Sequence, residues 1–125
     1  MAVKNPTVSQ PAKGVINLKW VLANGDTGAW FSCQQNTDRS VHAFGTFGAG
    51  GSVQVEGSND PAGTNAANPT NSFILHDVTQ TTTAVFTSAG AKQLLEATAW
   101  IRPNCTAGDG TTALTVEMTI IARRM

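Results

Sequence analysis

The sequence predicts an all-β fold, an antiparallel β-sandwich of about eight strands in a jelly-roll-like or another Greek-key arrangement. Short segments that alternate apolar and polar residues recur about every 10–15 residues, and turn residues separate them. No segment has a convincing helical period. The clearest evidence lies in the last third, where a strand ending in Trp100-Ile101-Arg102-Pro103 is followed by the turn Gly108-Asp109-Gly110-Thr111-Thr112 and a period-two strand over residues 114–122.

The first 13 residues differ in composition from the rest and predict an extended N-terminal arm before a single domain at residues 14–125. Pro6, Pro11 and several small polar residues leave too little apolar surface for this segment to fold alone. We expect it to be either disordered or ordered by lying on a neighbouring molecule. It contains no apolar run of the kind a secretory signal peptide needs.

The predicted strands follow from alternation between turn signals. In residues 15–22, Ile16, Leu18, Trp20 and Leu22 share one face, while Asn17 and Lys19 share the other. Further strands are predicted at residues 29–33, 41–47, 52–57, 73–78, 82–87, 94–103 and 114–122. Turns are predicted at residues 24–28, 48–51 and 88–91, the last with one helical turn capped by Ser88. The polar stretch 62–71 predicts a surface loop, the least ordered internal segment.

Composition restricts the classes of partner. Eight basic and eight acidic side chains cancel, and only 13% of the residues are charged. Because a neutral chain has no long-range field to attract phosphates or anionic lipids, nucleic acid and membrane surfaces are poor partners. The longest apolar runs are far too short to span a bilayer. Low charge also favours a surface that other subunits cover.

The two cysteines, Cys33 and Cys105, have no metal-ligand spacing between them. We interpret them as free buried thiols of a protein made in the cytosol. A disulfide between them requires a fold that brings their Cα atoms within about 7 Å.

The sequence shows no catalytic motif and predicts a protein that is not an enzyme and that binds no cofactor or metal. His42 and His76 are the only histidines. His76 and Asp77 cannot act as a base and its orienting carboxylate, because adjacent strand residues point to opposite faces. No Gly-x-Ser-x-Gly motif is present. Both histidines are therefore interpreted as structural.

The remaining polar and aromatic motifs also have structural interpretations. The carboxylates Asp26, Asp60, Asp77 and Asp109 stand beside turn residues and predict turns rather than a calcium site. The glycine-rich turns lack the Lys-Ser/Thr of a phosphate loop. The three tryptophans, Trp20, Trp30 and Trp100, are expected in the core or at subunit interfaces, whereas an exposed aromatic face would indicate sugar or partner binding.

Arg102 is the candidate contact residue inside the domain. It precedes Pro103 near a strand end, where its planar guanidinium can clamp a carboxylate or several backbone carbonyls of a partner. The alternative is a solvated arginine at a strand end. Arg123 and Arg124 similarly either reach a neighbour or solubilise the end of the chain.

An ordered set of segments resembles the small β-sandwich decoration, or cement, proteins encoded near the head genes of tailed bacteriophages. The segments are Asp38-Arg39-Ser40-Val41, Gly45-Thr46-Phe47-Gly48, Ser52-Val53-Gln54-Val55-Glu56-Gly57-Ser58-Asn59-Asp60, Leu75-His76-Asp77, Trp100-Ile101-Arg102-Pro103 and Gly108-Asp109-Gly110-Thr111-Thr112. The resemblance covers about residues 15–123, and its segments specify fold better than role. The loop at residues 61–71 is longer than expected for the group.

The resemblance implies a structural protein of the virion, located on the capsid exterior and made in the host cytoplasm, with no catalytic residues. The implied partners are the major capsid protein and the chain itself, as a homodimer or homotrimer. The expected contact residues are Lys4, Pro6, Pro11, Lys13, Arg102, Arg123 and Arg124.

Three alternatives make different structural predictions. A carbohydrate-binding or host-attachment module predicts an exposed tryptophan beside Asn or Asp in a groove. An enzyme predicts a pocket containing His42 or His76 with a carboxylate. A tail or neck component predicts rings rather than a lattice of dimers or trimers.

Overall fold

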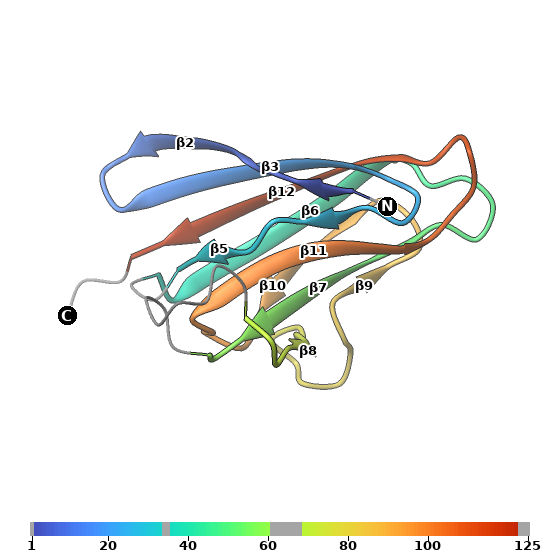
Figure 1. Cartoon of the computed structure of the whole chain (residues 1–125). Helices are drawn as coiled ribbons and strands as arrows, with labels where there is room; N and C mark the ends of the chain where they lie inside the picture. The colour runs from blue at the N-terminus through green and yellow to red at the C-terminus, as the bar shows by residue number, and fades with distance from the viewer. Residues whose placement is uncertain (1, 34–35, 61–68, 123–125) are drawn as a thin grey trace.

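The computed structural model describes residues 2–33, 36–60 and 69–122, and this part of the chain forms two β-sheets without a helix. The sequence-based prediction of an all-β sandwich is confirmed (Figure 1). One sheet contains β1 (Val3–Lys4), β4 (Thr27–Gly28), β5 (Phe31–Ser32), β7 (Ser52–Ser58), β8 (Phe73–Ile74), β9 (Val85–Phe86) and β11 (Trp100–Ala107). The other contains β2 (Thr7–Ala12), β3 (Val15–Ala23), β6 (Asp38–Thr46), β10 (Gly90–Leu94) and β12 (Ala113–Ile121).

The strand order is that of a jelly roll. Without β1 and β2, and with the short pairs β4/β5 and β8/β9 each taken as one position, eight positions follow one another along the chain. The five-stranded sheet contains the first, eighth, third and sixth of them, as β3-β12-β6-β10. The seven-stranded sheet contains the second, seventh, fourth and fifth, as β4/β5-β11-β7-β8/β9. This interleaving of two antiparallel sheets is the double Greek key of a jelly roll.

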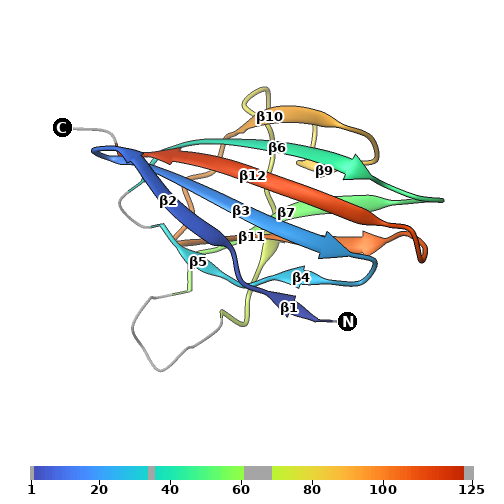
Figure 2. The same cartoon turned by 90° about the horizontal axis from the view of Figure 1, so that it is seen from above.

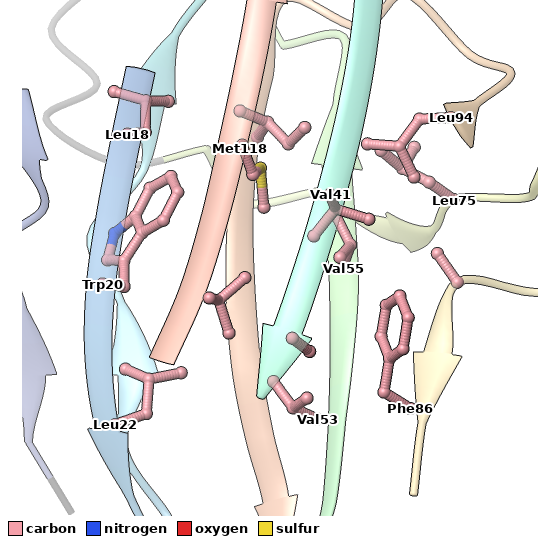
Figure 3. Packing of buried hydrophobic residues seen from close by; sticks show 14 of the residues in the cluster. Leu18, Trp20, Leu22, Val41, Val53, Val55, Leu75, Phe86, Leu94 and Met118 are labelled. Atoms are coloured by element: carbon pink, nitrogen blue, oxygen red, sulfur yellow. The ribbon is translucent and has the colours of Figure 1, made fainter. Parts of the chain in front are cut away.

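The core lies between the two sheets, because every second residue of each long strand points inward. Leu18, Trp20 and Leu22 of β3 face it together with Met118 of β12 and Val55 of β7 (Figure 3). The period-two alternation of residues 15–22 and 114–122 therefore predicts their buried faces correctly. None of the described segments forms a helix long and apolar enough to cross a membrane.

The N-terminal arm, expected to be either disordered or ordered on a neighbouring molecule, pairs with strands of its own chain. β1 pairs in parallel with β4, and β2 pairs with β3 at the edge of the other sheet, so the arm joins both sheets (Figure 2). The carboxylate of Asp26 accepts hydrogen bonds from the backbone N–H groups of Ala2 and Ala23. The segment is nevertheless exposed along most of its length, because it lies at sheet edges.

Several predicted boundaries are wrong. Residues 88–91 were expected to form a turn with one helical turn, but β10 (Gly90–Leu94) begins there because it pairs with β6. The strand expected at residues 94–103 is β11, which begins at Trp100 and continues to Ala107. The loop expected at residues 62–71 lies mostly outside the described residues.

The cysteines are buried and free, as predicted. Burial raises the pKa of the Cys33 thiol to about 11, and the nearby Arg39 opposes this only in part. A thiol with this pKa stays protonated near neutral pH and is a poor nucleophile.

One end of the sandwich is closed around a buried arginine. Arg39 of β6 is only 2% exposed. Its guanidinium donates to the backbone oxygens of Cys33, Asn36 and Thr98, and to the Thr98 hydroxyl. It thereby holds two loops, one after β5 and one before β11, against the end of β6.

Candidate functional site

A polar cluster occupies the outer face of the seven-stranded sheet, where β7 and β11 lie side by side. Their register places Glu56 opposite Arg102 and Gln54 opposite Asn104. Because residues two apart on a strand share a face, these four side chains lie together on the outside while Val53, Val55 and Ile101 fill the core. We call these four residues together with Trp30 the Arg102 cluster.

Trp30 reaches this cluster because the neighbouring strand is interrupted. β4 and β5 both pair with β11, but Pro103 of β11 has no N–H to donate. The segment between β4 and β5 therefore does not pair with β11. Gly28 permits the close approach at this point, since a Cβ there would lie 2.5 Å from Cδ of Pro103. The chain then places the Trp30 ring 4.3 Å from the guanidinium carbon of Arg102, a cation–π contact.

Glu56 is a buried carboxylate that its neighbours fully satisfy. It is 6% exposed. Its Oε1 accepts from Nε of Arg102 at 2.8 Å, and its Oε2 accepts from Nδ2 of Asn104 at 3.0 Å and Nε2 of Gln54 at 2.6 Å. Burial raises the pKa of Glu56, but the hydrogen bonds and the charge of Arg102 outweigh it, so the pKa lies below its ordinary value. The carboxylate therefore stays ionised and fixes the orientation of the arginine.

Arg102 retains donors for a partner. Only its Nε is engaged by Glu56, and no hydrogen bond from its two terminal nitrogens is found within the described residues. Held between a carboxylate and an indole ring, the guanidinium of Arg102, whose side chain is 24% exposed, presents these N–H groups at the outer face. A guanidinium with its plane fixed in this way suits a carboxylate or paired carbonyl oxygens.

The other tryptophans are placed differently. Trp100 is half-buried on the same outer face, and its indole N–H donates to the backbone oxygen of Asp60 at 3.0 Å. Trp20 is fully buried in the core. The expected core or interface placement is thus confirmed for Trp20, while Trp30 and Trp100 border the outer face.

The arm residues expected to contact partners are distributed along two sheet edges. Lys4 lies in β1, and its Nζ is 3.9 Å from Oδ2 of Asp26. Pro6 follows β1 and is half-buried, whereas Pro11 in β2 and Lys13 in the following turn are exposed. The structure does not bring these residues together with Arg102 in a shared contact. Arg123 and Arg124 lie outside the described residues.

A second polar pair lies beside the β8–β9 hairpin. Glu96 accepts from the backbone N–H of His76 at 2.7 Å, and its other oxygen lies 2.7 Å from Nδ1 of the same residue. Together with Gln80 and Leu95, the pair lines an open depression of about 330 Å³. The alternative of an enzyme predicted a histidine with a carboxylate in a pocket, and this arrangement matches that geometry.

The His76–Glu96 pair is not accompanied by further metal ligands in the described part of the chain. No set of three or more His, Cys, Asp or Glu side chains there could hold a metal ion. His42 lies elsewhere, on the outer face of the five-stranded sheet, with its ring against Phe44.

The four aspartates interpreted as turn residues all accept backbone hydrogen bonds. Asp60 accepts from Thr70 and Asn71, Asp77 from Thr79, and Asp109 from Thr111 and Ala49.

Arg102 was predicted as a contact residue from the sequence, whereas its neighbours Glu56, Gln54, Asn104 and Trp30 were not. The sequence contains one signal of this cluster, because two polar residues flank an apolar residue both at residues 54–56 and at residues 102–104. Strand order was needed to pair the two segments, and the Trp30 contact depends on a break in the sheet that the sequence shows only as Pro103.

Comparisons with known proteins support the fold. No protein-family model matches the chain, and no curated protein matches it. A solved structure of a cupin domain from Bordetella pertussis Tohama I superposes with a TM-score of 0.51 over 97% of this chain and 96% of that chain, at 18% sequence identity. At this identity the likeness shows a shared β-sandwich fold and carries no information about activity or ligand.

Proposed function

We propose that the protein is a structural component of a tailed-bacteriophage virion, which binds the outer surface of the capsid and stabilises the mature shell. The observation that carries the proposal is the Arg102 cluster, in which a buried carboxylate and an indole ring hold a guanidinium in place while its terminal donors stay available. An arginine that is already oriented loses little conformational freedom on binding, which is a property of interaction hot spots.

Other properties support the same role. The formal net charge is zero, and the described residues form a sandwich with a continuous core. Exposed apolar side chains in the arm, Val3 and Val8, offer further contacts at sheet edges. The order of turn and strand segments resembles decoration proteins, as described above. A protein that binds only the mature shell stabilises it by mass action, and many copies multiply the effect.

Co-sedimentation with expanded phage heads that lack this protein tests the proposal. We expect saturable binding at a fixed copy number per capsid subunit, and none to unexpanded heads. Arg102→Ala should weaken binding about tenfold or more, because hot-spot arginines lose this much when truncated. Lys92→Ala is the matched control, because Lys92 also lies over a ring, Phe86, and near a carboxylate, Asp77, but belongs to the other sheet. Absence of binding to heads of the correct phage contradicts the proposal.

A carbohydrate-binding module is the second candidate, and Trp30 beside Asn104, Gln54 and Arg102 is the feature that favours it. Sugars commonly stack on a free tryptophan face. Here Arg102 covers one face of the ring, so only the other face is available to a sugar. A glycan array together with the Trp30→Ala variant separates the two candidates, since glycan binding that this variant abolishes would favour the module.

A further inference from the structure

The outer face of the five-stranded sheet is broad and carries few charges. β3, β6 and β12 have nine residues each, and the order β10-β6-β12-β3-β2 places β12 at the centre (Figure 2). With about 3.3 Å per residue and about 4.8 Å between strands, the 38 residues of the five strands cover roughly 600 Å². A stable protein–protein interface buries about 600–1,000 Å² on each partner, so this face reaches the lower end of that range.

Apolar side chains are exposed on this face. Val21 of β3 is 57% exposed and Ile121 of β12 is 41% exposed, while Phe44 of β6 is half-buried. They alternate with small polar side chains such as Asn17 and Thr119, which hydrogen-bond to each other at 3.3 Å. A mixed face of this kind is typical of an interface that forms between already folded subunits.

Two opposite charges at the middle of the face lack an ion pair. Lys19 of β3 and Glu117 of β12 stand directly opposite each other in the strand register. No ion pair within 4.0 Å involves either side chain in the part of the chain that the structure describes. Both charges therefore remain available to groups above the sheet.

We propose that this face binds the same face of a second copy, around a two-fold axis parallel to the strands and midway between β3 and β12. Such an axis places β12 of one copy over β3 of the other. Residues that are paired between β3 and β12 within one chain then also face each other across the interface. Lys19 then meets Glu117 of the second copy, and the symmetry repeats this contact. In the same way Ile121 meets Val15 of the second copy, and Ala113 meets Ala23.

The alternative two-fold axis, which crosses the strands at the level of Glu117, is electrostatically unfavourable. It places Glu117 over Glu117 of the second copy and Lys19 over Lys19, and like charges in contact oppose association. The parallel axis also brings Lys13 of the second copy close to Asp38, because Asp38 shares a row with Ile121, Val15 and Ala12 across the sheet. In this arrangement the turn between β2 and β3 of the second copy, which contains Lys13, lies over a shallow hollow of about 170 Å³ beside Asp38.

The dimer goes beyond the proposed function and does not depend on it. It would leave the Arg102 clusters of the two copies on opposite outer sides. One dimer could then join two capsid subunits, which adds avidity without stronger individual contacts.

Sedimentation velocity of the full chain over a range of concentrations tests the dimer. We expect the wild type to dimerise, and Lys19→Glu and Glu117→Lys each to raise the dissociation constant about tenfold or more, because the two-fold axis repeats each like-charge contact. Thr106→Glu, on the outer face of the other sheet, is the matched control and should leave the constant unchanged.

A mixture of the two variants separates an interface from an effect within one chain. Within one chain, each single variant has like charges at positions 19 and 117. When the two variants form a heterodimer, opposite charges meet at both contacts between the chains. The mixture should therefore dimerise as tightly as the wild type, to within about threefold. A monomeric wild type, a trimer, or a mixture that stays monomeric overturns the proposal. A dimer that both charge reversals leave intact and that Ser9→Pro dissociates would assign the contact to the free edge of β2 instead.

Discussion

At the scale of single residues, Arg39 connects segments that are far apart in the sequence. It is a buried cation whose partners among the described residues are backbone oxygens and one hydroxyl rather than a carboxylate. Burial lowers the pKa of Arg39, with partial opposition from Cys33, but an arginine remains protonated under these conditions. Removing it leaves several buried acceptors without donors.

We expect Arg39→Met to lower the free energy of unfolding by about 3 kcal/mol, because each buried oxygen left without a donor costs about 1–3 kcal/mol. Arg39→Lys should cost less, because an ammonium group restores some but not all of the donors. Urea unfolding of the three proteins measures both effects. A methionine variant as stable as the wild type would show that the carbonyls find water instead.

Gln80 has a backbone conformation that favours glycine. Its φ is 65°, and its N–H donates to the backbone oxygen of Asp77 in the tight turn after β8. We expect Gln80→Gly to raise the free energy of unfolding by about 0.5–1 kcal/mol, because the left-handed region is strained for residues with a Cβ. Gln80→Ala should be close to neutral, since alanine keeps the strain. Thermal unfolding distinguishes the two, and a destabilised glycine variant would contradict the explanation.

At the scale of elements, the break between β4 and β5 depends on a tight contact between two strands. Gly28→Ala should lower the free energy of unfolding by about 1–3 kcal/mol, because its Cβ would overlap the ring of Pro103 and approach Trp20. Gly110→Ala is the control, since nothing lies within 4 Å of its Cβ position. Equal stability of the two variants would show that β4 can shift without cost.

The turn at residues 108–112 gives a stability that depends on pH. Hydrogen bonds from the Thr111 hydroxyl, and from the backbone N–H groups of Ala49 and Thr111, lower the pKa of Asp109 to about 2 from its ordinary 3.8. Because the pKa is lower in the folded state, the carboxylate stabilises the fold above pH 3.8, and this contribution is lost as the pH falls through about 2.

We therefore expect Asp109→Asn to be less stable than the wild type at pH 6, with a difference that shrinks between about pH 4 and pH 2. Urea unfolding across this range measures the difference. A difference that stays constant with pH would exclude the ionised carboxylate as its source.

At the scale of the whole molecule, the N-terminal arm covers one edge of each sheet. Deleting residues 1–13 removes β1 and β2 and leaves the edges of β3 and β4 without their partners. We expect this deletion to lower the melting temperature and promote aggregation, because a long unprotected strand edge is exposed. Val8→Ser keeps the strand and removes only an exposed apolar side chain, so it should leave the melting temperature within about 2 °C. An unchanged melting temperature after the deletion would show that the arm is dispensable for the fold.

The class of fold and the buried faces of the two longest predicted strands follow from the sequence alone. Alternation at period two fixes which side chains of residues 15–22 and 114–122 are buried, because a strand has only two faces. The turns at Asp77 and Asp109 were also predictable, since each carboxylate accepts from a backbone N–H two residues further along the chain. These features depend on residues close together in the chain.

Which distant segments meet depends on the folded arrangement of the whole chain. Arg102 and Glu56 are 46 positions apart, Arg39 and Thr98 are 59 apart, and His76 and Glu96 are 20 apart. Each contact requires a particular strand order and register, or a particular packing of loops, and alternation within one strand specifies none of these. The arm paired with its own sheets for the same reason, because the free edges of β3 and β4 exist only once both sheets have formed.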